Sequence, residues 1–425
     1  MMTHSNCPLT YEPQQQDFSK GDLMKRIFFA LALSVAAMPV FAQDTITTVA
    51  GNGNTVYSGD GGPATSAGIF WPQHITMIPG GGYYVSAYAQ LRKVDANGTI
   101  HTIAGNGTPG YSGDGGPAAA ASIAYMPVSM RLAPDGSLYF ADSANFRVRK
   151  IGTDGIIRTV AGNGTFNAGA DGIPATSSPV KYPMGIELDA AGNLYISEAS
   201  SCRIRKVDTH GIITTIAGNG ICATSGDGGS ALAASLHVPW GLRLDSVGNL
   251  YISESNGSNR IRKVDTSGTI TTVPGSVGIV EPMGMDFDAT GNLYVAAYGE
   301  HRVYRISPGG GTSVIAGSGT QGFSGDGGSA TSARLSNPRS VTVGSGVLYI
   351  ADGQNNRVRM MLADVAPQES AGTPSATTCA SEGYTGTKLQ WCINICESNL
   401  TGRQLDTWIK RWSDRYHNVP YCAVE

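Results

Sequence analysis

Four segments decide the fold of this chain: Gly185-Ile-Glu-Leu-Asp189, Leu194-Tyr-Ile-Ser197, Arg203-Ile-Arg-Lys-Val-Asp208 and Ile212-Ile-Thr-Thr-Ile-Ala217. Each is short and rich in β-branched residues, and hydrophobic and polar side chains roughly alternate along it. Glycine, asparagine and aspartate, which favour tight turns, lie between the segments. This pattern predicts four β-strands in succession.

The four-strand unit recurs along the chain. A phrase close to Thr-Ile-Ala-Gly ends at Gly51, Gly105, Gly162, Gly218, Gly275 and Gly317. Successive copies are 54, 57, 56, 57 and 42 residues apart, and the short fifth interval lacks a loop insertion that the others carry. Four-stranded units of about 40 to 50 residues cannot bury both sheet faces alone, so they pack around an axis as propeller blades. The sequence therefore predicts an all-β fold, a six-bladed β-propeller.

The two ends of the repeat region complement each other. Thr45-Ile-Thr-Thr-Val-Ala50 has the pattern of a fourth strand, but no blade precedes it. The last unit supplies only three strands, at Ser340–Val343, Val347–Ile350 and Arg357–Met361. We expect the N-terminal strand to complete the last blade, because this closes the ring and removes an exposed sheet edge.

The repeated pattern resembles the NHL repeat over residues 45–361. The matching phrases are Pro-x-Gly-Ile-x-Leu-Asp, Gly-Asn-Leu-Tyr-Ile-Ser-Glu, Arg-Ile-Arg-Lys-Val-Asp and Gly-x-Ile-x-Thr-Ile-Ala-Gly. The loop Tyr111-Ser-Gly-Asp-Gly-Gly-Pro-Ala118 further resembles teneurin-type NHL domains and many secreted bacterial relatives. This resemblance implies a six-bladed propeller that presents a binding surface. A minority of similar propellers are metal-dependent amidating lyases or lactonases, so any activity has to be argued from residues.

Composition narrows the class of protein. Charged residues make up 14% of the chain and the formal net charge is −3. This gives no basic footprint for nucleic acid. No stretch after residue 42 is long and apolar enough to cross a bilayer, so no transmembrane segment is expected in the mature chain.

The N-terminal region has the pattern of an export signal. The basic start Met24-Lys25-Arg26 precedes an apolar run, Ile27–Val40, and Val40-Phe41-Ala42 matches a signal-peptidase site. Residues 1–23 are polar and irregular, and we interpret them as a non-structural leader, with Met24 as an alternative start. Residues 24–42 are then the signal peptide, and the location is periplasmic or secreted.

A second module is predicted after the repeats. Residues 362–378 are rich in Pro, Ser, Thr and Ala and read as a linker. Residues 379–425 hold four cysteines and three of the five tryptophans, typical of a small disulfide-rich module. A capping pattern at Thr401-Gly-Arg-Gln404 and the apolar spacing that follows predict a helix. Its aromatic face serves either as the module's own core or as a docking surface.

Six cysteines follow the predicted cleavage site. They are Cys202, Cys222, Cys379, Cys392, Cys396 and Cys422. An even number outside the cytosol favours disulfides. We predict a Cys202–Cys222 bridge, because both loops emerge on one propeller face, with two free buried thiols as the alternative. The pairing of the four C-terminal cysteines stays open, and a zinc site there has weak support because no companion ligand pair is present.

The glycine-rich connectors each carry one aspartate. These are Asp60, Asp114, Asp171, Asp227 and Asp326. The further acidic residues that a calcium loop requires are missing. We interpret the aspartates as turn formers and helix N-caps. The acids that end the second strands are Asp142, Glu198, Glu254 and Asp352. We expect each either to accept backbone N–H bonds within its loop or to pair with an arginine of the third strand, such as Arg147, Arg203, Arg260 or Arg357.

One column of the innermost strands carries charge. The fourth residue after each strand's first proline is Thr76, Arg131, Glu187, Arg243, Asp286 and Thr342 in turn. Equivalent positions lie at one height around the axis, so the four charges are expected to form an ion-pair belt with alternating sign. The belt either latches blades together or offers a binding site suited to a zwitterion.

Few residues suit catalysis. His74 and His237 are expected near the channel mouth, where a two-histidine metal site completed by Glu198 or Glu254 is the alternative to a site without metal. Tyr88 and Tyr298 replace the second-strand acid region in two blades and place aromatic groups on the loop face. The sequence contains no nucleophile elbow, phosphate loop or His-Glu-x-x-His motif.

These features favour binding over catalysis. The predicted function is an exported scaffold for a protein, peptide or glycan, with no cofactor, whose candidate binding residues are His74, Tyr88, Arg131, Glu187, Arg243, Asp286 and Tyr298. The alternative is a metal-assisted lyase or hydrolase with its site at the channel mouth.

Export predicts a defined N-terminus. When the full chain is produced in an exporting bacterial host, the mature protein is expected to begin at Gln43, because cleavage follows small residues at Val40 and Ala42. Intact mass measures this directly. An Ala42→Arg variant serves as the uncut control, and a mature wild-type protein that keeps residues before Gln43 would contradict the prediction.

Overall fold

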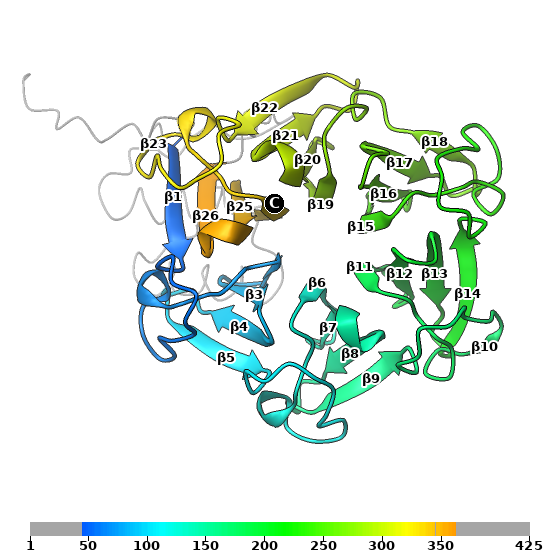
Figure 1. Cartoon of the computed structure of the whole chain (residues 1–425), viewed down its shortest axis with the longest axis horizontal. Helices are drawn as coiled ribbons and strands as arrows, with labels where there is room; N and C mark the ends of the chain where they lie inside the picture. The colour runs from blue at the N-terminus through cyan, green and yellow to red at the C-terminus, as the bar shows by residue number, and fades with distance from the viewer. Residues whose placement is uncertain (1–44, 345, 363–425) are drawn as a thin grey trace, which may run out of the picture. The chain divides into compact units, whose positions relative to one another are not determined.

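The computed structural model describes residues 45–344 and 346–362. In this part of the chain six sheets surround a central axis (Figure 1). The predicted leader, signal peptide, helical module and all of the linker except Leu362 lie outside the described residues. The six-bladed all-β propeller is confirmed.

Each blade is an antiparallel sheet that runs outward from the axis. Blade 1 consists of β2 (His74–Met77), β3 (Tyr83–Ala87), β4 (Gln90–Val94) and β5 (Ile100–Ala104). Blade 2 consists of β6 (Pro127–Leu132), β7 (Leu138–Asp142), β8 (Arg147–Ile151) and β9 (Ile157–Ala161). Blade 3 consists of β11 (Pro183–Leu188), β12 (Leu194–Glu198), β13 (Arg203–Val207) and β14 (Ile212–Ala217), with β10 (Ile173–Pro174) on its outer edge.

The remaining blades follow the same order. Blade 4 consists of β15 (Pro239–Leu244), β16 (Leu250–Glu254), β17 (Arg260–Val264) and β18 (Ile270–Thr272). Blade 5 consists of β19 (Pro282–Phe287), β20 (Leu293–Ala297), β21 (Arg302–Ile306) and β22 (Thr312–Ala316). Blade 6 consists of β24 (Pro338–Gly344), β25 (Val347–Asp352) and β26 (Arg357–Leu362), and β1 (Thr45–Ala50) completes it.

The first and last strands close the ring as predicted. β1 pairs antiparallel with β26, from Ile46 opposite Met361 to Ala50 opposite Val358. The short strand β23 (Gly328–Ser329) then covers the outer edge of β1. In Figure 1 the blue N-terminal strand lies beside the orange C-terminal strands, so the ends of the repeat region share one sheet.

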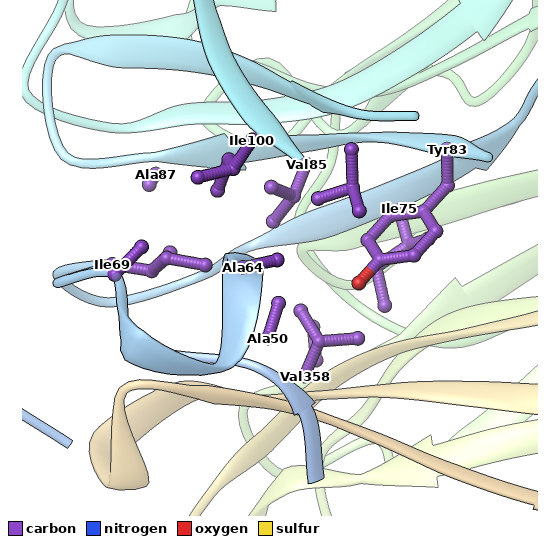
Figure 2. Packing of buried hydrophobic residues seen from close by; sticks show 12 residues of the cluster. Ala50, Ala64, Ile69, Ile75, Tyr83, Val85, Ala87, Ile100 and Val358 are labelled. Atoms are coloured by element: carbon purple, nitrogen blue, oxygen red, sulfur yellow. The ribbon is translucent and has the colours of Figure 1, made fainter. Parts of the chain in front are cut away.

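The core is divided into clusters between neighbouring blades. At the closure, Ala50 and Val358 of blade 6 pack against Ile75 and Val85 of blade 1, and the connector residue Ile69 fills the space beside them (Figure 2). All five are fully buried. Burial of apolar surface at roughly 25 cal/mol per Å² makes such clusters the main source of cohesion between blades.

A buried arginine organises five of the six blades. It is the third residue of the third strand, Arg92, Arg149, Arg205, Arg262 or Arg359, and its side chain is fully buried. Each arginine forms an ion pair with the connector aspartate before its blade, at 2.5 to 2.7 Å, namely Asp60, Asp114, Asp171, Asp227 and Asp326. In four blades the second-strand acid lies 3.4 to 3.5 Å from the same guanidinium. The arginine therefore fastens the connector onto the blade that follows it.

Two interpretations from sequence were wrong in detail. The connector aspartates are not helix N-caps, since Pro63 and Pro117 precede the short helices η1 (Ala64–Ser66) and η2 (Ala118–Ala120) with no side-chain cap. The second-strand acids contact the third residue of the third strand, not its first. In both cases a buried guanidinium has more donors than one partner satisfies, so it recruits both acids.

In blade 5 both the glycine-rich connector loop and the buried third-strand arginine are absent. This blade follows the short connector and carries Tyr304 where the other blades carry the buried arginine. The Tyr304 hydroxyl donates to Glu300 Oε2 at 2.5 Å. The one short connector, which lacks the glycine-rich loop, thus precedes the one blade of the described propeller that lacks the buried arginine.

Removing one buried arginine is expected to destabilise the propeller. Arg149→Met leaves the fully buried Asp142 without its cationic partner, and breaking a buried pair in this way costs about 3–5 kcal/mol. Urea unfolding measures the loss. The matched control is Arg158→Met, whose ion pair with Asp154 is more than half exposed and is therefore expected to contribute little to stability. Equal losses in the two variants would refute the fastening role.

Candidate functional site

The channel is lined by the innermost strands β2, β6, β11, β15, β19 and β24 (Figure 1). These strands begin on the face where the connectors emerge, which we call the loop face. In each strand the residue after the first proline lies nearest that face, and the charged column predicted from sequence lies three residues further along the channel. The site has a mouth layer and a belt layer.

The structure brings the four charged residues of the column together. Arg131 Nε lies 2.9 Å from Glu187 Oε1, and Arg243 Nη1 lies 3.1 Å from Glu187 Oε2. Arg243 Nε lies 2.7 Å from Asp286 Oδ1. The charges therefore alternate in sign across blades 2 to 5 in one continuous network.

The same column bridges the other blade junctions by hydrogen bonds. Asp286 Oδ2 accepts from the Val343 amide at 2.9 Å, and Thr342 Oγ1 donates to the Ile75 carbonyl at 2.8 Å. Thr76 Oγ1 donates to the Met130 carbonyl at 3.0 Å. All six junctions are thus crossed by one layer of side chains, which we call the belt.

Arg131 also extends across the channel. Its Nη2 donates to the carbonyl of Leu242 in blade 4 at 3.0 Å, and its Nη1 lies 3.0 Å from His74 Nε2. Because a guanidinium only donates, His74 accepts through Nε2 and is neutral. Burial, followed by the charges of Arg131 and Arg243, holds the pKa of His74 well below its usual value.

Glu187 is ionised at the centre of the belt. Burial by itself would raise its pKa, but the charges of Arg131 and Arg243 outweigh burial, and the pKa is lowered. The same carboxyl accepts from the Leu188 amide at 3.0 Å. Both oxygens of Glu187 are engaged, because two arginines and one backbone amide hold the carboxylate.

Two cavities lie on either side of the belt and share His74, Arg131 and Met285. The narrow cavity, about 20 Å³, is on the loop-face side and is lined by Gln73, Val128, Met184, Trp240 and Arg339 together with belt-side residues. The wide cavity, about 540 Å³, is at the opposite end. Its walls are mostly apolar, and Arg131 and Arg243 are its charged residues.

An arc of aromatic side chains surrounds part of the loop-face mouth. We call Tyr125, Tyr88, Phe70, Trp71 and Tyr298 the aromatic arc. Neighbouring ring centroids lie 6.4 Å apart for Tyr125 and Tyr88, 5.2 Å for Tyr88 and Phe70, and 6.5 Å for Phe70 and Trp71. Both tyrosines named from sequence belong to it.

Arg339 links Tyr298 to the rest of the arc. Its guanidinium carbon lies 4.7 Å from the Trp71 ring centroid and 4.6 Å from that of Tyr298. Sequence reasoning missed Arg339, Trp71 and Gln73. The signal was present in the column directly after the proline, where Val128, Met184, Trp240 and Met283 are apolar but Gln73 and Arg339 are polar.

The proposed pair of histidine ligands is not brought together in either channel cavity. His74 lines both cavities, but His237 lines neither, and its Nδ1 lies 3.0 Å from the Ser255 carbonyl. Glu198 and Glu254 are buried beside Arg205 and Arg262. Within residues 45–344 and 346–362 no group of three or more His, Cys, Asp or Glu side chains is arranged to hold a metal ion.

Cys202 and Cys222 lie within bonding distance on the loop face. Their Cα atoms are 5.3 Å apart and the structure joins their sulfurs. This separation suits a disulfide. Cys202 is fully buried at the turn between β12 and β13, whereas Cys222 lies in the connector after β14. Formation of the Cys202–Cys222 disulfide in the exported protein stays a prediction.

Comparison with known proteins agrees with this fold. No family model matches the chain. Human teneurin-1 is 28% identical over 369 residues, which cover 74% of this chain and 13% of teneurin-1. Teneurin-m of Drosophila melanogaster is 31% identical over 298 residues, 60% of this chain and 10% of that protein. The repeat region is teneurin-like.

The chain therefore spans about an eighth of the length of the teneurins that it matches. Among solved structures, an auxiliary nutrient binding protein of Bacteroides thetaiotaomicron superimposes with a TM-score of 0.55 and 16% identity, over 74% of this chain and 75% of that one. A protein of unknown function from the same species gives 0.55 and 16% over 75% and 76%. At this identity the likeness shows the fold alone.

Within residues 45–344 and 346–362 no helix has the length and hydropathy that spanning a membrane requires.

The neutral state of His74 makes stability depend on pH. Below pH 6.5 the unfolded chain takes up a proton at His74 that the folded belt excludes, so stability falls as pH falls. The loss attributable to His74 is about 1 kcal/mol between pH 7.5 and 5.5. We expect His74→Gln to show a smaller loss over this range in urea unfolding.

The control for this measurement is His210→Gln, whose side chain is 86% exposed. His301 has a pKa lowered by burial and contributes in the same direction in every variant. If His74→Gln and the wild type had the same pH dependence, the neutral His74 bridge would be wrong.

Proposed function

We propose that this chain is an exported, non-catalytic propeller whose loop face binds a protein, peptide or glycan. The observation that carries this proposal is the aromatic arc around the channel mouth. Aromatic rings with polar tips give large contact area at low entropic cost, which is why they dominate binding surfaces. Tyr125 is 40% exposed and lies at one end of the arc.

The belt supports binding over acid–base catalysis. A catalytic carboxylate needs a free oxygen within reach of substrate. Glu187 and Asp286 instead hold two arginines and backbone amides. Using either as a general base would require breaking an ion pair that crosses a blade junction. The belt is therefore assigned a structural role beneath the binding surface.

Export completes the proposal. The predicted signal peptide places the chain in an oxidising compartment, where the Cys202–Cys222 bond would brace two loops of the binding face. The predicted cysteine-rich module at residues 379–425 would serve as a docking or anchoring appendage. The teneurins contribute only their likeness in sequence, because the chain covers a small part of their length.

Site-specific photo-crosslinking tests which face binds. The photoreactive amino acid benzoylphenylalanine is placed at Tyr125 on the loop face or at Val247, which is 70% exposed in the turn between β15 and β16 on the opposite face. In intact cells that export the full chain, we expect one defined product from position 125 and none from position 247. Equal products from both positions, or none from 125, would refute loop-face binding.

A further inference from the structure

Arg339 is a buried cation without a carboxylate partner. The residue is 7% exposed and lines the narrow cavity. Its Nε has no hydrogen-bond partner, and within the described residues no carboxylate lies within 4.0 Å of it. Burial lowers the pKa of Arg339 and outweighs the opposing effects of Tyr298, which acts through its charge and a side-chain hydrogen bond, and of the Glu281 carboxylate.

This sets Arg339 apart from the other buried arginines of the described propeller. Arg149 and its four counterparts each contact an aspartate at 2.5 to 2.7 Å. The belt arginines contact Glu187 and Asp286. A buried charge without a counter-ion is costly, so its usual surroundings include a paired anion. At Arg339 no carboxylate of residues 45–344 and 346–362 lies within ion-pair distance, and Glu281 acts on it only from farther away.

Neighbouring polar atoms are also unpaired. Trp71 Nε1, Ser340 Oγ and Gln73 Oε1 are buried without a hydrogen-bond partner, although Gln73 Nε2 donates to the Trp71 carbonyl at 3.0 Å. Gln73 and Ser340 are 2% and 1% exposed. Trp71 and Gln73 directly precede β2, and Ser340 is the third residue of β24. Unpaired groups that can donate outnumber unpaired acceptors at this corner, as expected of a site that receives an anion.

The guanidinium is held in place by two rings. Trp71 and Tyr298 lie 4.7 and 4.6 Å from its carbon. Such contacts stabilise a desolvated cation and restrict its rotation. A planar guanidinium with a fixed orientation matches the two oxygens of a carboxylate. The narrow cavity, about 20 Å³, admits a water-sized group, so only a small anionic head fits while the rest of the ligand lies outside.

We propose that Arg339 and its unpaired neighbours form a carboxylate-binding site at the loop-face mouth, which receives an acidic side chain or the C-terminal carboxylate of a peptide. A peptide is favoured over an acidic sugar because the adjoining wall is apolar, with Val128, Met184 and Trp240. Sugar hydroxyls would find few partners there. This inference rests on the proposed function and names the chemistry of its ligand.

The probes are small molecules that differ only in the carboxylate. N-acetyl-leucine carries a C-terminal carboxylate, N-acetyl-leucinamide lacks it, N-acetyl-aspartic acid α-amide carries a side-chain carboxylate, and glucuronic acid represents acidic sugars. Ligand-observed NMR with the full mature chain measures their binding. We expect at least one of the two amino-acid carboxylates to bind at least tenfold more tightly than the neutral amide, and the one that binds identifies the source.

Variants assign the effect to Arg339. Arg339→Gln is expected to weaken carboxylate binding at least tenfold, whereas Arg334→Gln, an exposed arginine in the connector before the same blade, leaves it unchanged. Equal binding of acid and amide, unchanged binding by Arg339→Gln, or tighter binding of glucuronic acid would each overturn the proposal.

Thermal unfolding separates a ligand site from a structural residue. Because no carboxylate of the described propeller forms an ion pair with Arg339, Arg339→Met is expected to melt at or above the wild-type temperature, whereas Arg149→Met melts lower. A matching loss in both variants would make Arg339 structural and overturn the proposal. If position 125 still gives its crosslinked product but the protein does not distinguish acid from amide, this inference alone is overturned. If the crosslinked product and the selectivity for carboxylates are both absent, the proposed function is overturned as well.

Discussion

The propeller depends on a single layer of side chains that crosses every blade junction at the channel. Arg131, Glu187, Arg243 and Asp286 carry this layer through blades 2 to 5 as ion pairs. Two threonines and a backbone amide carry it through the rest. Because each acid satisfies donors from two neighbours, displacing one blade would leave a buried charge unpaired, and this is far more costly than the net gain from the pair itself.

A second set of buried ion pairs joins each connector to one blade instead of joining neighbouring blades. The third-strand arginines do not join blades at the axis but hold each glycine-rich connector against the following blade, and in four blades the acid of the second strand lies beside the same guanidinium. At Asp114 burial acts to raise the pKa of the carboxyl, but hydrogen bonds from Thr159 and Arg149 outweigh it and the pKa is lowered. Blade 5 lacks the loop, its aspartate and the arginine together, as expected if these three form one structural unit.

Function is inferred where the sixfold pattern breaks. Positions that recur in most blades are explained by packing, capping of loops or ion pairing. The mouth layer is different, because Gln73 and Arg339 replace apolar residues on two adjacent blades and Trp71 precedes one of them. Polar atoms left unpaired in a buried corner are hard to explain by folding alone. The aromatic arc passes through the same corner, so the irregular residues and the binding surface coincide.

The architecture of this protein could largely be predicted from the periodicity of its sequence. Strand-length hydrophobic patterns and the spacing of the Thr-Ile-Ala-Gly phrases determined six blades, and an unpaired first strand determined how the ring closes, since both are local signals repeated many times. The charged column was readable too, because equivalent positions in a repeat occupy one height. The partners of the connector aspartates and the unpaired state of Arg339 were decided only by the tertiary structure. Those contacts join residues more than 30 positions apart, or depend on a partner that is missing, and neither leaves a mark in local sequence.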